Sequence, residues 1–271
     1  MPLALDLSAS EAKIERAREH LESLQREARA FVEDGNAYTV RVTPIDKDGW
    51  SDALIRSHDA PKYAFGTIVG DLIHNLRSAL DYIVTALVDA SPPATLTTQH
   101  QFPIFETEVG YKARVGTKHS ALPNGRLGNV RFGLEEIWEL QPFHRKPSPI
   151  HDPLWAIAKL SNADKHRTLP VFAPLIQSGE GEWFIERGAF LRNVTLPPLA
   201  DWQPNQEHHV GRVQIVGAHG AQPYYRANLT LDVHVSLAAF PGQHPAFSFK
   251  AGELLIFCNY VAKIVNLFKQ L

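Results

Sequence analysis

Residues 62–89 read KYAFGTIVGDLIHNLRSALDYIVTALVD, and this stretch decides the fold. A proline at position 61 suits the first turn of a helix, and Ser91-Pro92-Pro93 stops one. At about 100° per residue, the apolar side chains of the stretch gather in one arc. The pattern therefore predicts a long helix whose apolar face must be covered by other helices. The arc consists of Leu72, Ile73, Leu76, Ala79, Leu80, Ile83, Val84 and Leu87.

A polar flank of the same predicted helix carries His74, Arg77 and Asp81. Positions 74 and 81 differ by only about 20° around the helix axis, and Arg77 lies beside them. One interpretation is an ordinary amphipathic helix with a wet side and an Arg77–Asp81 pair four residues apart. The other is a functional cluster, because these side chains in an apolar segment cost free energy unless they find partners.

A second polar cluster, LSNADKHR at residues 160–167, ends a helix predicted from Pro153 to about His166. The apolar residues of this helix point in nearly all directions, which is typical of a buried helix. We expect it to pack against the first helix, so that the two clusters form one site. The alternative is a satisfied polar network that only fixes helix packing. An arc of about 60° on this helix contains Trp155, Lys159, Asn162 and His166.

The rest of the chain predicts an α+β fold. A Ser8–Glu11 capping box starts a charged helix that continues to Glu33, and an apolar helix closes the chain. We expect a helical bundle, an antiparallel sheet of about four to six strands, and a C-terminal helix that packs back on the bundle. Residues 1–170 (mainly helical) and 171–271 (strands and last helix) should form one continuous globular unit. The expected strands are residues 37–45, 53–56, 171–176, 183–190, 209–216 and 225–238.

The composition narrows the function classes. With 44% hydrophobic and 21% charged residues and a net charge of −2, the 271-residue chain has no global basic excess for non-specific nucleic-acid binding. The single cysteine, Cys258, excludes an internal disulfide framework and a multi-cysteine zinc site. We expect a cytoplasmic protein without signal peptide, membrane span or cofactor. A homodimer is left open.

The two clusters together supply the groups of an anion site. His74 and His166 can act as acid and base near neutral pH, and Arg77 and Arg167 can clamp a phosphate or carboxylate. The leading hypothesis is a pocket that recognises an anionic group, either a small ligand or an RNA phosphate, with metal-independent cleavage by a 2′-hydroxyl. The further ligand-binding candidates are Asp81, Asn162, Asp164 and Lys165.

Two alternatives stay open beside this hypothesis. The clusters can be a buried packing network in a non-enzymatic protein whose sheet binds a protein partner. They can also hold a metal, since Asp71-x-x-His74 and Asp164-x-His166 offer oxygen and nitrogen ligands. A carboxylate-bridged di-metal bundle normally uses several Glu and Glu-x-x-His pairs, which this sequence lacks.

Four motifs, in order, resemble those of a family of bacterial proteins of similar length. This resemblance rests on most of residues 60–170 and implies no particular function. The motifs are GDLIHNLRSALD at 70–81, FPI at 102–104, LQPF at 140–143 and LSNADKHR at 160–167.

More distantly, the chain resembles HEPN-type helical domains, many of which are RNA-cleaving toxins or defence proteins. Their usual mark is an arginine followed four to six residues later by a histidine on the same helix. Arg77 has no histidine at this spacing, so the resemblance implies a composite site of Arg77 with His166 from another helix. The pairs that fit the spacing lie among prolines or next to a glycine: Arg114 with His119, and Arg145 with His151.

Overall fold

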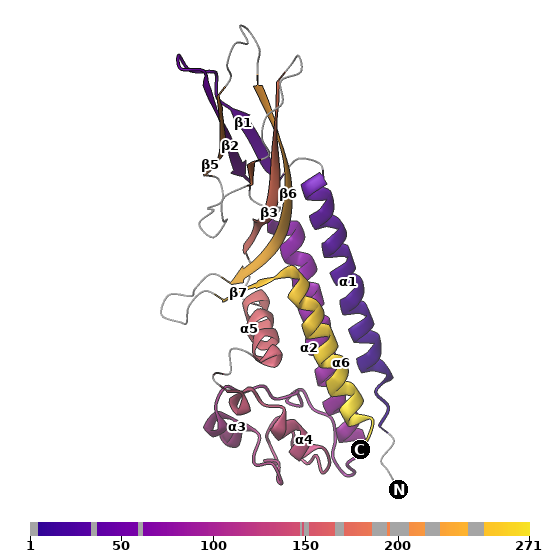
Figure 1. Ribbon diagram of the computed structural model, residues 1–271. Coiled ribbons are helices and arrows are strands. Elements are labelled where there is room, and N and C mark those ends of the chain that lie inside the picture. The colour runs from indigo at the N-terminus through magenta and orange to yellow at the C-terminus, as the bar shows by residue number, and fades with distance from the viewer. Residues whose placement is uncertain are drawn as a thin grey trace. The chain divides into compact units, whose positions relative to one another are not determined.

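The computed structural model describes residues 5–33, 37–58, 62–146, 148, 152–165, 171–185, 194–195, 206–214, 223–237 and 247–271. Helices dominate the first part of this chain and its C-terminus, and most strands lie between them in sequence (Figure 1). The predicted α+β class is confirmed. None of the helices in these ranges combines the length and apolar character that a membrane span requires.

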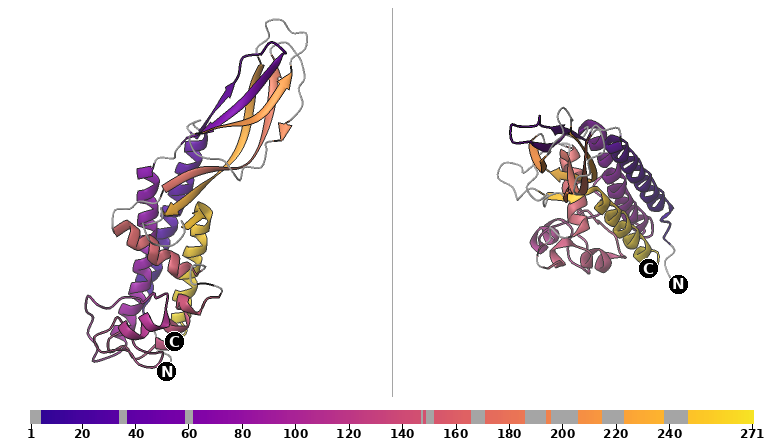
Figure 2. Two further views of the ribbon diagram at one scale, coloured as in Figure 1. Left: turned by 90° about the vertical axis from the view of Figure 1, so that its left-hand side faces the viewer. Right: turned by 45° about the horizontal axis from the view of Figure 1, so that its top comes forward.

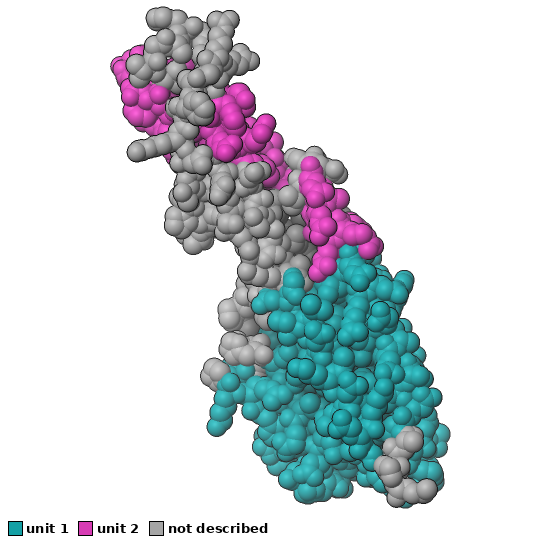
Figure 3. Space-filling model, turned by 45° about the vertical axis from the view of Figure 1, so that its right-hand side comes forward, with its two compact units in different colours: residues 1–24, 66–170, 252–271 teal, residues 25–65, 171–251 magenta. Residues whose placement is uncertain are grey.

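The chain forms two compact units (Figure 3). The helical unit contains residues 1–24, 66–170 and 252–271, and the strand unit contains residues 25–65 and 171–251. The division is thus discontinuous along the sequence, rather than a single break at residue 170. The hairpin at residues 38–57 belongs to the strand unit because it pairs with a strand that follows residue 170. The last helix belongs to the helical unit because its apolar face packs on the early helices.

Three helices that lie mostly in the helical unit run side by side: α1 (Ser8–Glu33), α2 (Lys62–Asp89) and α6 (Leu254–Phe268) (Figures 1 and 2). The bounds of α2 are those predicted, and its apolar arc is buried. The Ser10 hydroxyl donates to the Ala79 carbonyl at 2.9 Å, which ties α1 to α2. Phe268 and Leu87 both face Gly133, so α6 packs back on the bundle as expected.

The start of α1 differs from the predicted capping box. Ser8 is already the first helical residue, and the carboxylate of Asp6 accepts its backbone N–H at 3.0 Å. Glu11 pairs with Lys269 beyond α6 instead of reaching back to the helix start. The cap therefore begins two residues earlier, because an aspartate can accept both the N–H and the hydroxyl of Ser8.

Short elements complete the helical unit. They are α3 (Glu108–Arg114), α4 (Leu134–Glu139), η1 (Pro142–His144), α5 (Pro153–Lys165) and η3 (Ala251–Glu253). The side chain of Asp152 is fully buried, accepts the Leu154 N–H at 2.8 Å and pairs with Arg145. Asp152 thus starts α5 by capping it, which agrees with the predicted start of this helix at Pro153.

The described residues of the strand unit form two antiparallel sheets rather than one. The first has the order β1-β2-β5 and the second the order β4-β3-β6-β7. Strands predicted at 171–176 and 183–190 are replaced by one long strand, β3, with a bulge between Ile176 and Ser178. The bounds are β1 Tyr38–Val42, β2 Trp50–Ser57, β3 Val171–Ile185, β4 Val194–Thr195, β5 Glu207–Gln214, β6 Pro223–Leu237 and β7 Phe247–Lys250.

Side chains from both sheets form one small core, to which Tyr38 of β1 adds a hydrogen bond to the Ala227 carbonyl at 3.1 Å. The buried members are Ala53, Ile55, Trp183, Val210, Val213, Tyr225 and Ala227. Along β2, the buried residues Ser51, Ala53 and Ile55 alternate with more exposed ones, so this strand turns one face to the core.

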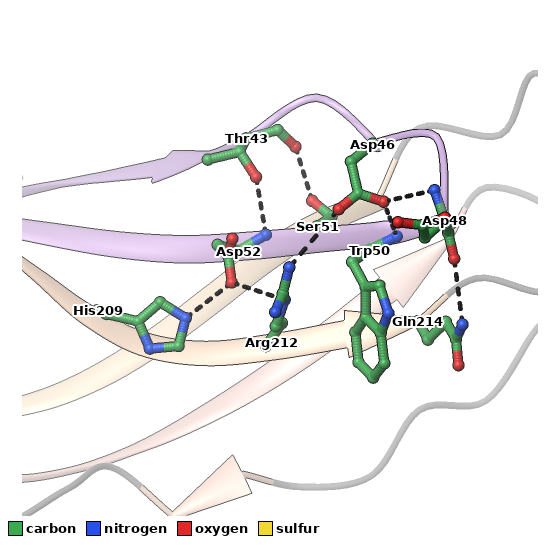
Figure 4. A network of polar contacts seen from close by, with 9 residues as sticks. All are labelled: Thr43, Asp46, Asp48, Trp50, Ser51, Asp52, His209, Arg212 and Gln214. Carbon is green, nitrogen blue, oxygen red and sulfur yellow. Dashed lines mark hydrogen bonds and ion pairs between the residues drawn. The ribbon is translucent and has the colours of Figure 1, made fainter.

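A polar network covers the β1–β2 turn and its neighbour β5 (Figure 4). The carboxylate of Asp46 accepts the N–H groups of Asp48 and Trp50, and Gly49 takes a φ of 84° that suits glycine. Asp52 pairs with His209 at 2.8 Å and with Arg212 at 3.3 Å. These contacts fix the turn and the register of the sheet, so we interpret them as structural.

Candidate functional site

The two helices that carry the polar clusters meet at one pocket of the helical unit. This pocket, called here the arginine pocket, has a volume of about 120 Å³. Its walls come from α2, from α5 and from the segment between α2 and α4. The lining residues are Arg77, Gln101, Ile104, Arg126, Ala158, Ser161 and Asn162.

Arg77 is held in place by Asp81 of the same helix and by the backbone carbonyl of Phe102. Its Nη2 donates to Asp81 Oδ1 at 2.9 Å and to the Phe102 carbonyl at 2.6 Å. The same carboxylate oxygen accepts the Phe102 N–H at 2.8 Å. The Arg77 side chain is only 14% exposed, and Nη2 makes both of these bonds. Its remaining N–H groups have no recorded partner within the described part of the chain, and they can bond a ligand.

Arg126 brings a second positive charge to the pocket. Its guanidinium lies over the Phe105 ring at 5.1 Å and forms no ion pair with any described residue. Burial lowers the pKa of Arg126, the nearby Arg114 lowers it further, and Asp81 opposes both effects. Burial also lowers the pKa of Arg77, Asp81 opposes this, and the Arg126 charge adds to the lowering. Free arginine has a pKa above about 12, so both groups stay charged at neutral pH.

The segment that carries Arg126 is fixed by two side chains. Gln141 is fully buried, and its amide donates to the carbonyls of Pro103 and Ile137 at 2.9 Å while accepting the Phe105 N–H. His100 Nδ1 accepts the Thr97 N–H at 2.9 Å. Its Nε2 therefore carries the proton and donates to the Gly128 carbonyl. These bonds therefore hold the wall of the arginine pocket that faces α2 and α5 in place without a ligand.

A second, larger pocket adjoins the first and is called here the amide pocket. It has a volume of about 700 Å³ and shares Gln101 and Arg126 with the arginine pocket. Backbone bonds join its walls, since the Arg126 N–H donates to the Arg114 carbonyl and the Gln101 N–H to the Arg126 carbonyl. The other lining residues are Gln99, Ala113, Arg114, Leu122, Pro123, Asn124 and Gly125.

The structure brings together three of the predicted site residues and separates a fourth. Arg77 and Asn162 line the arginine pocket, and Asp81 orients Arg77. His74 is exposed on α2 and does not line the pocket, so the structure does not support it as a catalytic residue there. His74 lies three residues before Arg77, so their side chains differ by about 60° around the helix axis. This rotation is enough to turn the His74 side chain from the pocket to solvent.

The remaining predicted residues lie at or beyond the end of α5. Asp164 and Lys165 belong to its last turn, and the structure describes only their backbone. His166 and Arg167 lie outside the described residues, so the composite site of Arg77 and His166 stays a prediction. Arg114 and His119, which fit the HEPN spacing, do not share a helix, because α3 ends at Arg114.

Sequence reasoning missed Arg114 and Arg126 as members of the site. Both lie in an irregular region without helical or strand periodicity, so no pattern links them to α2. Among the described residues, no group of three His, Cys, Asp or Glu side chains could hold a metal ion. Asn75, another polar residue of α2, has a structural role, since its amide donates to the Asp71 carbonyl and accepts from Lys13 of α1.

Searches with family models, among curated proteins and among solved structures found no match to this chain.

Proposed function

We propose that the helical unit binds an anionic group of the phosphate class in the arginine pocket. One observation carries this proposal: two guanidinium groups, Arg77 and Arg126, line the same pocket, and Asp81 is their one carboxylate neighbour among the described residues. Two close positive charges repel each other, and a single, partly exposed carboxylate offsets only part of that repulsion. A bound anion would offset the rest.

The size and the polar lining of the pocket fit a phosphate. Liquid water occupies about 30 Å³ per molecule, so a volume of about 120 Å³ admits a group of a few non-hydrogen atoms. Asn162, Ser161 and Gln101 add neutral hydrogen-bonding groups to the two arginines. Arginine is suited to such a ligand because its planar fork donates two parallel bonds to phosphate oxygens.

The proposal is binding rather than catalysis. No histidine or carboxylate among the described residues lines the arginine pocket, so that part of the chain supplies no general base there. An RNA phosphate remains one form that the anion could take. Cleavage would need a base from outside the described residues, for which His166 is the sequence candidate.

Calorimetric titration of the full chain with inorganic phosphate at low ionic strength tests the proposal. The Arg126→Gln variant should bind phosphate at least about tenfold more weakly, a loss of about 1.4 kcal/mol, because a charge-assisted bond is lost. Arg131→Gln is the matched control, since Arg131 is exposed and lines neither pocket. Equal phosphate affinity in the two variants, or no binding to the wild type, would refute the proposal.

A further inference from the structure

The arginine pocket opens a further question, namely how large its ligand is. Arg126 is a wall of both pockets, so a ligand anchored on it can extend from the arginine pocket into the amide pocket. The amide pocket is also the larger of the two, at about 700 Å³. A lone phosphate would leave most of this joined space empty.

The positively charged side chains extend from the arginine pocket into the amide pocket. Arg77 lines the first pocket, Arg126 both pockets, and Arg114 the second. A hydrogen bond from the Arg126 N–H to the Arg114 carbonyl holds these two residues next to each other. Arg114 is exposed and has no ion pair among the described residues. The one carboxylate, Asp81, contacts Arg77 at the far end, so the Arg114 end carries the less compensated charge.

Resting on the proposed function, we infer that the ligand carries two neighbouring phosphate groups, one between Arg77 and Arg126 and the other between Arg126 and Arg114. Each phosphate would then contact two guanidinium groups, with Arg126 bridging them. This arrangement explains why an exposed arginine lies beside a half-buried one, although neither forms an ion pair with a described residue.

The rest of the amide pocket suits the organic part of a nucleotide. Gln99, Gln101 and Asn124 line it with side-chain amides that have no recorded hydrogen bond to a described residue. Amides can match the donor and acceptor edges of a base, and the apolar surfaces of Leu122 and Pro123 can contact its face. The shared chemistry is that of a nucleoside diphosphate and of a short stretch of single-stranded nucleic acid.

Paired titrations of the full chain with inorganic phosphate and with pyrophosphate test this inference. The wild type should bind pyrophosphate at least about tenfold more tightly than phosphate at low salt. Arg114→Gln should weaken pyrophosphate binding at least about fivefold more than it weakens phosphate binding, whereas the control Arg131→Gln should change neither. The Arg114 side chain is exposed, so the variant should keep the helical content of the wild type, which circular dichroism can verify.

The outcomes separate this inference from the proposed function. If phosphate binds in an Arg126-dependent way but pyrophosphate binds no better, the two-phosphate inference is wrong and the anion site stands. If neither anion binds, both fail. An Arg114→Gln variant that weakens phosphate and pyrophosphate equally would also overturn the second phosphate position.

Competition with uridine diphosphate and with a five-residue oligouridylate then distinguishes the two sources of this chemistry. Stronger competition by the oligonucleotide would identify a strand. Its affinity should then fall with salt, with a slope that loses about 0.7 in Arg114→Gln, as expected for one fewer contact to a single strand. Stronger competition by the diphosphate would identify a free nucleotide. Failure of both to displace pyrophosphate would overturn the nucleotide assignment.

Discussion

Replacing Asp81 by asparagine separates the structural and the binding roles of the polar cluster on α2. The Asp81 carboxylate accepts bonds from Arg77 Nη2 at 2.9 Å and from the Phe102 N–H at 2.8 Å. The amide oxygen of the Asp81→Asn variant can still accept one or both of them. The variant loses the negative charge, so the contact to Arg77 changes from a charge-assisted pair to an ordinary hydrogen bond.

The expected loss of stability is moderate. Hydrogen bonds to charged groups contribute about 1.5–3 kcal/mol and neutral ones about 1 kcal/mol. Because the Asp81 side chain is 34% exposed, solvent screening places the loss near the lower end of the difference, at about 1 kcal/mol. For a chain of this size, 1 kcal/mol lowers the melting temperature by about 2–4 °C.

The same substitution should tighten anion binding. A phosphate bound to the other side of the Arg77 guanidinium would lie on the order of 6 Å from the Asp81 carboxylate, and removing that charge would then remove a repulsion of about 1 kcal/mol at a dielectric constant between those of water and the protein surface. This corresponds to about a fivefold gain in affinity at low salt, and the gain should shrink as salt screens the charges. A purely structural cluster predicts the stability loss without any gain in affinity.

Thermal melting and phosphate calorimetry on the same preparations measure both effects. Asp89→Asn is the matched control, because Asp89 is an exposed residue at the end of the same helix. A variant at Asp81 that binds phosphate more weakly than this control would refute the electrostatic argument. It would mean that the position of Arg77, and not the charge balance of the pocket, limits binding.

Two further predictions concern the helical core. Burial raises the pKa of the Cys258 thiol to about 11, so at pH 8 only about one thiol in a thousand is ionised. A disulfide reagent should therefore modify the native protein at least about 100-fold more slowly than the urea-unfolded protein. Fast labelling of the native protein would contradict this prediction, because it would show that the thiol is accessible. Gly133 has a φ of 72° and a Cβ there would lie 2.8 Å from the Phe268 ring, so Gly133→Ala should cost about 1–3 kcal/mol in urea unfolding. Its control, Gly252→Ala, faces open space and should change stability by less than about 0.5 kcal/mol; similar losses in both variants would contradict the argument.

The local elements of this chain were largely predictable from its sequence. The bounds of α2 agree with the prediction, because an uninterrupted apolar arc lies between one proline and a Pro-Pro stop. The fusion of two predicted strands into β3 was not predictable. Glycines and polar residues at 177–182 look like a linker, yet pairing with β6 continues across them through a bulge. Strand pairing is a long-range interaction that local patterns do not encode.

Some residues of the candidate site were predictable from the sequence, and others were not. Periodicity alone placed Arg77 beside Asp81 and predicted that Asn162 would face the same region, because helical geometry relates such positions along one element. Only the tertiary structure brought Arg126 to the pocket and turned His74 away from it. Arg126 lies in an irregular segment, and backbone bonds to Arg114 and Gln101 hold it in place. Residues on a helix are related by a fixed geometry, whereas residues joined through an irregular segment are related only by the contacts that the folded chain makes.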